Sequence, residues 1–216
     1  MRPFTFPYET KVEELELGSR CLRIESLASL DQTIDAHFKE FERTGNTDLF
    51  EDLCPYFGNP WPAGRALASY ADEHSGDWRG LEILELGCGL ALPSLVLAQA
   101  GIKARVMDLH PDVPAFLERN LKHNSLHGIE CETADWTYGV GGAEPDILLG
   151  SDILYDAKIP EALLGYLKKS SRWRELVIAD PDRPHLGKFL EGVKSLGWHL
   201  EEEGLMGVRI FRISRD

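Results

Sequence analysis

The stretch "LEILELGCGLALPSLVLAQAG" (residues 81–101) places Gly87 and Gly89 between two apolar runs. The first run has the short, nearly continuous apolar pattern of a strand that is buried on both faces. The second run has the length of a helix and ends at Gly101, a common residue just after a helix. A glycine turn between them lets the backbone approach a ligand closely, beside the free N–H groups of the helix N-terminus. The stretch therefore predicts the first half of a nucleotide-binding βαβ unit.

Strand-like and helix-like segments continue to alternate along the rest of the chain. Four more strands are expected, over residues 104–109, 129–135, 146–154 and 175–181, and residues 198–216 are expected to form two closing strands. The intervening helices are expected over 91–100, 111–124, 160–173 and 183–197. This alternation is typical of a parallel sheet covered by helices. We predict an α/β fold with a doubly wound, mostly parallel, seven-stranded Rossmann-like sheet and helices on both faces. The acidic run Glu201 to Glu203 is interpreted as a solvated turn between the closing strands.

Residues 1–60 have a different pattern and are predicted to form an N-terminal extension to a domain of residues 61–216. Alternating residues around Gly18 and Ser19 predict a small β-hairpin. A helix is expected after it, capped near Ser29 or Asp31. The Pro- and Gly-rich segment 54–64 is expected to be a shaped loop without regular structure, followed by a helix over 65–74.

Composition and charge exclude several functional classes. The 216 residues, 43% of them hydrophobic, suit one globular domain with a full core. The chain has no apolar run of membrane-spanning length and no secretion-signal pattern, so we expect a cytoplasmic protein without a membrane partner. The four cysteines form no C-x-x-C pair, which argues against a zinc ribbon or a disulfide framework. A net charge of −13 repels phosphate backbones, so no nucleic-acid partner is expected and a cationic ligand or basic protein is favoured.

The glycine turn departs from the dinucleotide-binding fingerprint. That fingerprint has a third Gly or Ala three positions after the second Gly, where this chain has Leu92. Glu85 is expected at the carboxyl end of the first strand, where a carboxylate would repel a diphosphate and attract a cation. A ligand that carries an ammonium or a sulfonium group fits this turn better than NAD does.

Residues 85–91, "ELGCGLA", resemble the first motif of the class I S-adenosylmethionine-dependent methyltransferases, an acidic residue followed by Gly-x-Gly-x-Gly. Ala91 stands in place of the third glycine. The next strand ends in "VMDLHP", which puts Asp108 where this family has an acidic residue for the ribose hydroxyls. Asp108 follows Gly87 by 21 residues, near the spacing of roughly 20 that this role requires. The third strand ends in "TADW", where Asp135 and Trp136 match the positions at the adenine end of the cofactor.

A narrower resemblance covers most of the chain. "PWPAGRALASY" (residues 60–70) and "DILYD" (residues 152–156) are similar to segments of the seven-β-strand protein-lysine methyltransferases, a family that includes the enzyme for the electron transfer flavoprotein β subunit and its bacterial relatives. "ADPDRP" (residues 179–184) looks similar to the flavoprotein-methylating branch, although the roles of Asp180, Asp182 and Arg183 stay open. The resemblance implies that S-adenosylmethionine is the cofactor and S-adenosylhomocysteine the product. The residues it implies for cofactor binding are Trp61, Glu85, Gly87, Cys88, Gly89, Asp108, Leu109, Asp135, Trp136 and Ser151.

The same resemblance implies that Asp152 and Tyr155 are catalytic and that the acceptor is a lysine of a protein substrate. Methyl transfer is an in-line displacement that needs alignment more than acid catalysis. Asp152 would orient the amine, and Tyr155 would supply an aromatic face or a hydroxyl. The carboxylate also favours a protonated amine, which opposes the deprotonation that transfer requires, so the positive sulfur of the cofactor must help. The competing interpretation of Asp152 is a cap for the following helix.

Other functions remain as alternatives. Within the methyltransferases, the alternative acceptor is a small-molecule amine or another protein side chain. Two hypotheses come from other functional classes: a non-catalytic protein that binds the cofactor, and a dinucleotide-dependent oxidoreductase. His123 and His127 have the spacing of a metal pair, but no third ligand sits at a matching helical position, so no metal is expected. The substrate, the number of methyl groups and the oligomeric state are left open by the sequence.

Overall fold

A seven-stranded sheet forms the centre of the protein in the computed structural model, which describes residues 8–45, 54–142 and 144–215. The strand order is β5-β4-β3-β6-β7-β9-β8. Strands β3 to β7 are parallel, and β9 runs antiparallel to both β7 and β8. The predicted mostly parallel seven-stranded sheet is therefore confirmed. The strands are β3 (Ile83–Leu86), β4 (Ala104–Asp108), β5 (Ile129–Thr133), β6 (Ile147–Ser151), β7 (Glu175–Asp180), β8 (His199–Leu205) and β9 (Val208–Ser214).

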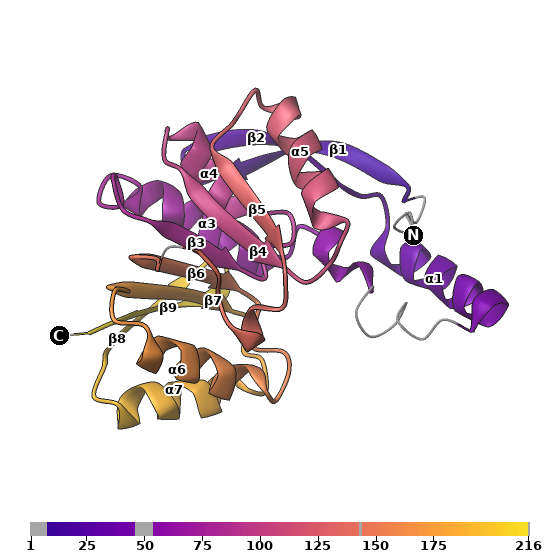
Figure 1. Ribbon diagram of the computed structural model, residues 1–216. Coiled ribbons are helices and arrows are strands. Elements are labelled where there is room, and N and C mark those ends of the chain that lie inside the picture. The colour runs from indigo at the N-terminus through magenta and orange to yellow at the C-terminus, as the bar shows by residue number, and fades with distance from the viewer. Residues whose placement is uncertain (1–7, 46–53, 143, 216) are drawn as a thin grey trace.

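Helices cover both faces of this sheet, as Figure 1 shows. One layer holds α3 (Pro62–His74), α4 (Leu92–Gln99) and α5 (Val113–His123), and the opposite layer holds α6 (Ile159–Lys169) and α7 (Leu186–Ser195). The alternation of side chains along a strand explains the two layers. In β6, Ile147 and Leu149 share a core cluster with α3, whereas Leu148 belongs to the cluster that contains α6 and α7. No helix in the described part of the chain is long and apolar enough to cross a bilayer.

The chain changes direction in the sheet at β3. It passes from β3 to β4 and β5 on one side, then returns to add β6 on the other side. Such a switch point leaves a crevice beyond the carboxyl ends of the strands, where ligands of open α/β sheets bind. Across the described residues between β5 and β6, the connection forms only the one-turn 3₁₀ helix η2 (Trp136–Tyr138).

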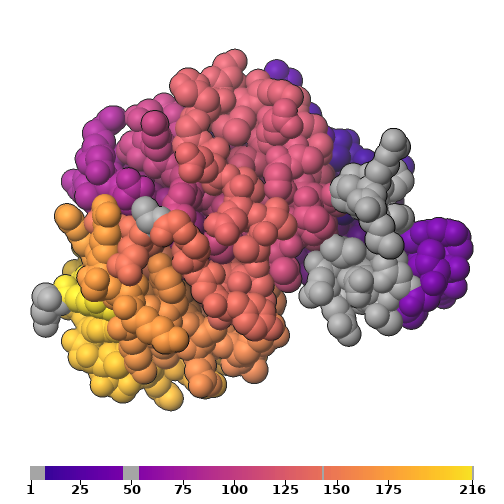
Figure 2. Space-filling model, in the orientation of Figure 1, coloured from indigo at the N-terminus to yellow at the C-terminus, as the bar shows by residue number. Residues whose placement is uncertain are grey.

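The N-terminal extension contains the predicted hairpin and helix. Strands β1 (Thr10–Leu17) and β2 (Arg20–Leu27) are antiparallel, and α1 (Leu30–Thr44) begins after Ser29, whose side chain accepts a hydrogen bond from the Gln32 N–H. The α1 residues project to one side of the sheet layers (Figures 1 and 2). The hairpin shares a core cluster with α4 and α5. Residues 1–7 and 46–53 of the predicted extension lie outside the described residues, and the boundary at residue 61 stays a prediction.

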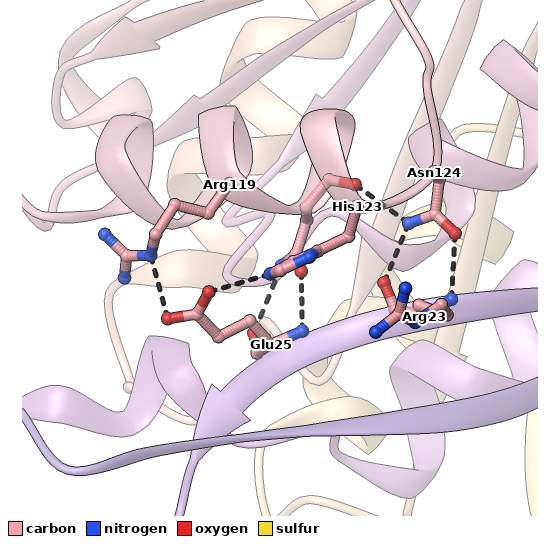
Figure 3. Close-up of polar contacts among 6 residues, drawn as sticks. Arg23, Glu25, Arg119, His123 and Asn124 are labelled. Atoms are coloured by element: carbon pink, nitrogen blue, oxygen red, sulfur yellow. Dashed lines mark hydrogen bonds and ion pairs between the residues drawn. The ribbon is translucent and has the colours of Figure 1, made fainter.

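Asn120 of α5 and Asn124, the C-cap residue of that helix, bind the free edge of the hairpin, and Figure 3 labels Asn124. The Asn124 amide accepts from the Arg23 N–H at 2.8 Å and donates to the Arg23 carbonyl at 2.7 Å. Asn120 forms the same pair of bonds with Glu25, at 2.6 and 3.2 Å. Four residues of helix rise about 6 Å, and two residues of strand about 6.6 Å, so the two amides match the backbone repeat of β2. The edge of β2 is therefore capped by side chains.

The Glu25 carboxylate adds an ionic contact between the same two elements. It accepts a hydrogen bond from Nε of Arg119 at 2.9 Å and contacts Nε2 of His123 at 3.0 Å (Figure 3). Desolvation opposes the ionisation of Glu25, but hydrogen bonds from His123, Thr10 and Arg119 outweigh it and lower the pKa of the carboxyl. His123, considered above as half of a metal pair, thus contacts a carboxylate of the hairpin.

Two local expectations are wrong. Residues 201–203 lie inside β8 and form no turn, because Glu201 and Glu202 face Arg212 and Arg209 of β9, which neutralise them. The segment 54–64 is partly regular. It contains the 3₁₀ helix η1 (Pro55–Gly58), and α3 begins three residues before the expected position, at Pro62. Proline is favourable at the first position of a helix, where its missing N–H would have no partner.

Candidate functional site

A cavity of about 590 Å³ lies at the switch point of the sheet. Its walls come from the residues that follow β3, β4, β5, β6 and β7, together with η1 and the start of α3. Of the twelve predicted site residues, all but Glu85 line it. The eleven residues in the lining are Trp61, Gly87, Cys88, Gly89, Asp108, Leu109, Asp135, Trp136, Ser151, Asp152 and Tyr155.

The turn after β3 has the backbone conformation that its glycines suggest. Gly87 and Gly89 have φ values of 58° and 51°, in the left-handed region that favours glycine. A Cβ on Gly89 would meet the carbonyl oxygen of Phe57 at 3.0 Å, so the close approach of η1 also requires glycine there. Ala91, which replaces the third glycine of the motif, adopts the same left-handed conformation with φ 54°. The turn thus keeps the glycine geometry at all three positions.

Asp108 stands at the end of β4 with a fixed orientation. Its Oδ2 accepts a hydrogen bond from the Gly89 N–H at 2.8 Å, and its Oδ1 accepts one from the His110 N–H at 2.9 Å. Burial raises the pKa of Asp108, and these backbone hydrogen bonds act in the opposite direction. Each carboxylate oxygen can accept a second hydrogen bond, so Asp108 can still bind hydroxyl groups in the cavity.

Asp135, Trp136 and Trp61 form the aromatic and polar walls beside Asp108. The Asp135 side chain caps η2, because its Oδ1 accepts from the Thr137 N–H at 2.9 Å. The Trp136 ring is almost fully buried and is part of the core under the sheet end. Trp61 begins α3, and its indole N–H donates to the Tyr56 carbonyl at 2.8 Å. These rings are therefore held in place by the protein itself.

Glu85 is the predicted residue that the structure places elsewhere. It is fully buried, and its Oε2 accepts hydrogen bonds from the main-chain N–H of Ser94, at 3.1 Å, and from the Ser94 hydroxyl. Along β3, Glu85 faces the same side as Ile83, which packs toward α3 and α4. Burial raises the pKa of Glu85 to about 8, against the effect of the Ser94 hydrogen bonds. Glu85 thus holds the first turn of α4 behind the cavity wall.

Asp152 and Arg183 form an ion pair in the wall of the cavity. Nε and Nη2 of Arg183 donate to the two carboxylate oxygens of Asp152 at 2.5 and 2.8 Å. The interpretation of Asp152 as a helix cap is wrong, since α6 begins only at Ile159 after the N-cap residue Lys158, and both Asp152 oxygens bind Arg183. Asp152 has φ 58°, and its N–H donates to the Ala179 carbonyl at 2.8 Å.

Tyr155 presents an exposed ring beside this ion pair. Desolvation raises the pKa of its phenol, and the negative charges of Asp108, Asp156, Asp135 and Asp152 raise it further. The phenol therefore keeps its proton at neutral pH and cannot serve as a general base. It can offer a ring face or a hydroxyl.

Sequence reasoning missed several lining residues. Tyr56 and Phe57 belong to the segment expected to be a shaped loop with two aromatics, so the loop was identified but not its contact with Gly89. His110 and Lys158 line the cavity without any motif that would single them out. Arg183 was noted in "ADPDRP", but its partner could not be read from spacing. Within the described ranges, no group of three or more His, Cys, Asp or Glu side chains is arranged to hold a metal ion.

Comparison with solved structures shows where this fold occurs. The magnesium protoporphyrin IX methyltransferase ChlM of Synechocystis PCC 6803, solved with bound S-adenosylmethionine, superposes with a TM-score of 0.59. That match covers 88% of this chain and 100% of that chain at 17% sequence identity. The architecture is therefore that of the Rossmann-like methyltransferases.

Curated relatives and a family model are more similar to this chain in sequence than the solved structure is. The electron transfer flavoprotein beta subunit lysine methyltransferase of Danio rerio is 29% identical over 147 residues, covering 65% of this chain and 55% of the relative. The calmodulin-lysine N-methyltransferase of Arabidopsis thaliana is 27% identical over 188 residues, with coverages of 79% and 59%. The histone-arginine methyltransferase METTL23 of Xenopus laevis is 31% identical over 122 residues, with coverages of 51% and 50%.

The chain thus spans between half and three fifths of the length of these relatives. The family model, described as lysine methyltransferase, matches residues 56–187, which contain the glycine turn, most of the cavity lining and Arg183. On this match and the arrangement of the cavity, the chain belongs to the lysine methyltransferase family.

Proposed function

We propose that this protein transfers a methyl group from S-adenosylmethionine to a lysine side chain of a protein substrate. One observation carries the proposal: a single cavity is lined by the glycine turn and Asp108 and also by Asp152 and Tyr155. Membership of the lysine methyltransferase family supports the same reaction. Relatives named as lysine methyltransferases of the electron transfer flavoprotein beta subunit and of calmodulin support a protein acceptor.

The cavity residues fit the cofactor. A volume of about 590 Å³ lies in the range of small-molecule and cofactor sites, roughly 300–1,000 Å³. The turn at Gly87 and Gly89 lines the cavity with main chain, and the fixed Asp108 carboxylate has lone pairs for two neighbouring hydroxyls. Trp136 and Asp135 offer an apolar wall and a polar edge for an adenine ring. When bound, the cofactor supplies a methyl group on a positively charged sulfur.

Asp152 and Tyr155 would align the acceptor amine. They follow β6, whose carboxyl end borders the cavity, so an amine that enters there lies near both side chains. The Asp152 carboxylate orients the amine by a hydrogen bond, and the Tyr155 ring stabilises the cationic product. A lysine amine has an unperturbed pKa of about 10.4, so its presentation as a neutral amine at pH 7 costs about 4–5 kcal/mol unless the site lowers that pKa.

Exposed apolar side chains around the cavity support a macromolecular acceptor. Tyr56, Leu109 and Tyr155 line the cavity, yet each is more than 40% exposed, and Tyr138 in η2 is 90% exposed. Apolar side chains gathered at a cavity mouth are typical of a surface that another chain covers. The net charge of −13 favours a lysine in a basic segment.

Arginine is the second candidate acceptor, because METTL23 of Xenopus laevis is named a histone-arginine methyltransferase. One experiment separates the two. The protein is incubated with cell extract and S-adenosylmethionine labelled on its methyl group, and the labelled amino acid is identified by mass spectrometry. Methyllysine in a protein band supports the proposal, and methylarginine supports the second candidate. Labelling confined to small amines, or calorimetry that shows binding of NAD but not of S-adenosylmethionine, would overturn the proposal.

We also propose that the protein works in the cytoplasm. Cys21, Cys54, Cys88 and Cys131 are all free thiols in the structure, and free thiols persist in reducing compartments. Fractionation of cells followed by immunoblotting tests this, and recovery of the protein in an oxidising compartment would contradict it.

A further inference from the structure

A permanent cation stands in the wall of the cavity beside Asp152. The Arg183 guanidinium lines the cavity, and its Nε and Nη2 occupy both carboxylate oxygens of Asp152 at 2.5 and 2.8 Å. The Asp152 side chain is only 11% exposed, whereas that of Arg183 is 39% exposed. A bidentate pair with a mostly buried carboxylate is better oriented than an ordinary surface ion pair.

The loop after β7 fixes Arg183 before any substrate arrives. The Arg183 N–H donates to Oδ1 of Asp180 at 2.6 Å, which closes a tight turn. Asp182, at the centre of that turn, has φ 68° and pairs with Arg209 of β9 at 2.7 Å. The register of β6 and β7 sets Ser151 opposite Ala179, so Asp152 emerges beside this turn. The Asp152–Arg183 pair is therefore a property of the fold.

This pairing changes the charge that an acceptor amine meets. A lone carboxylate would stabilise the ammonium form of lysine, which has no lone pair for methyl transfer. The ion pair has no net charge, and its guanidinium disfavours a second cation beside it. Each Asp152 oxygen still has a lone pair that can accept a hydrogen bond from a neutral amine.

Other carboxyl groups interact with the pair and with Tyr155, and they are unchanged when Arg183 is replaced. Asp180 is fully buried and outside the cavity lining, and Asp182 is paired with Arg209. Tyr155 is uncharged at neutral pH, and Lys158 adds a second cation to the same wall. Asp108, Asp135 and Asp156 act electrostatically on Tyr155, so the cavity keeps negative charge that Arg183 offsets at Asp152.

We propose that Arg183 is a positioning residue that neutralises Asp152, so that the site accepts lysine as an uncharged amine and uses Asp152 as its hydrogen-bond acceptor. The inference rests on the proposed function. The amine loses its proton to solvent on entry, and its lone pair then forms the N–C bond as the C–S bond breaks. The positive charge passes from sulfur to nitrogen, and the methylated product leaves the neutral ion pair as a cation.

A binding experiment tests the charge effect without any need for activity. Butylammonium, which carries the lysine head group, is titrated at pH 7 and constant ionic strength into the wild type, Arg183→Met and Arg172→Met. Arg172 is the matched control because it also makes a two-point pair with a buried aspartate, Asp146, but lies outside the cavity lining. Arg183→Met should bind butylammonium at least about tenfold more tightly than the other two proteins, and Arg183→Met/Asp152→Asn should lose that gain. Equal affinities in Arg183→Met and wild type would overturn the proposal.

The pH profile of kcat, which reports ionisations in the enzyme–substrate complex, tests the consequence for catalysis. Removal of the guanidinium raises the pH at which the bound amine deprotonates, so Arg183→Met should lose about tenfold or more at pH 7 and recover near pH 9.5. Arg183→Lys keeps a cation and should lie between Arg183→Met and wild type. A loss that is equal at every pH would mean a merely structural role and would contradict the proposal. If the wild type methylates no lysine, the proposed function fails, and butylammonium binding still decides the role of Arg183.

Discussion

Oδ2 of Asp108 accepts a hydrogen bond from the backbone N–H of Gly89 at 2.8 Å, which ties the end of β4 to the turn after β3. The other oxygen is held by the His110 N–H at 2.9 Å. The carboxylate is therefore oriented by the protein alone, and a ligand that binds to it does not have to order it. This geometry makes Asp108 the clearest test of the cofactor site.

Asp108→Ala should weaken S-adenosylmethionine binding by about 2–4 kcal/mol, because hydrogen bonds to a charged acceptor contribute roughly 1.5–3 kcal/mol each and are not additive. Calorimetry measures the affinity. Since Asp108 also holds the glycine turn, Asp108→Asn is the control that keeps an oxygen acceptor, and the thermal midpoint of each variant checks the fold. Unchanged affinity in a well-folded Asp108→Ala would remove Asp108 from the cofactor site.

Asp152→Asn should leave S-adenosylmethionine affinity within a few-fold and lower kcat at least about a hundredfold, roughly 2.7 kcal/mol. Asn is the appropriate substitution, because Asp152 has φ 58° and Asn tolerates the left-handed conformation better than Ala. Asp146→Asn is the matched control, since Asp146 also forms a two-point pair with an arginine, Arg172, but lies outside the cavity lining. Full activity of Asp152→Asn would show that Asp152 does not act on the acceptor.

Tyr155→Phe should retain activity within about fivefold, because the ring face that stabilises the cationic product remains. The raised pKa of the phenol already excludes it as a base at neutral pH. Turnover with a lysine substrate, measured beside Tyr155→Ala, decides the role. If Tyr155→Phe loses as much activity as Asp152→Asn, the hydroxyl is the functional group and the aromatic role is wrong.

The sequence predicted most of the cavity because its motifs report where strands end. Gly87, Asp108, Asp135 and Asp152 each follow a parallel strand, and the carboxyl ends of neighbouring parallel strands meet at one edge of the sheet. That argument needs only spacing and strand order. It identifies which residues reach the cavity without any knowledge of side-chain directions.

The residues that were misplaced or missed depend on directions that spacing does not contain. Glu85 belongs to the motif, but the alternation along β3 turns its side chain toward Ser94 in α4 and away from the cavity. Arg183 reaches Asp152 only because Asp180 and Asp182 fold the intervening loop into a tight turn. The order of strands can be inferred from the hydrophobic pattern of a sequence. The conformation of the loop that brings Arg183 to Asp152 cannot be inferred in that way.

The buried Glu85 predicts a specific pH dependence of stability. Its pKa rises from 4.5 to about 8 on folding, so the folded state retains a proton that the unfolded state releases. The contribution of Glu85 to stability is complete below pH 4.5 and is lost as the pH rises toward 8. Glu85→Gln removes this titration. We expect the free energy of unfolding of wild type to fall relative to Glu85→Gln between about pH 5 and pH 8.

Chemical denaturation of both proteins across that pH range measures the difference. Gln adds buried N–H groups, and their energetic cost does not vary with pH. The test is therefore how the difference in free energy of unfolding between the two proteins changes with pH, and its absolute size is not used. Glu14→Gln, at an exposed position of β1, is the control for carboxylate loss in general. A difference between wild type and Glu85→Gln that is constant with pH would mean that Glu85 is ionised in its buried position.

Asn120 of α5 and Asn124 just after it make the same hydrogen bonds to β2, one at a buried and one at an exposed position. Their substitution therefore measures how much these bonds contribute to the free energy of unfolding. Asn120 is fully buried and satisfies the N–H and carbonyl of Glu25, so Asn120→Ala leaves two buried backbone groups without partners and should cost about 2–4 kcal/mol. Asn124 binds Arg23 in the same way at an exposed edge, where water can replace the amide, so Asn124→Ala should cost about 1 kcal/mol or less. A helix interior favours alanine over asparagine by up to about 0.7 kcal/mol, so part of the loss of stability in Asn120→Ala is offset by helix propensity. The measured loss therefore underestimates the contribution of the Asn120 hydrogen bonds.

Urea denaturation followed by circular dichroism gives both free energies, and faster hydrogen exchange of the Glu25 amide in Asn120→Ala would locate the loss in β2. Equal losses in free energy of unfolding for Asn120→Ala and Asn124→Ala would show that the contribution of these hydrogen bonds does not depend on their burial.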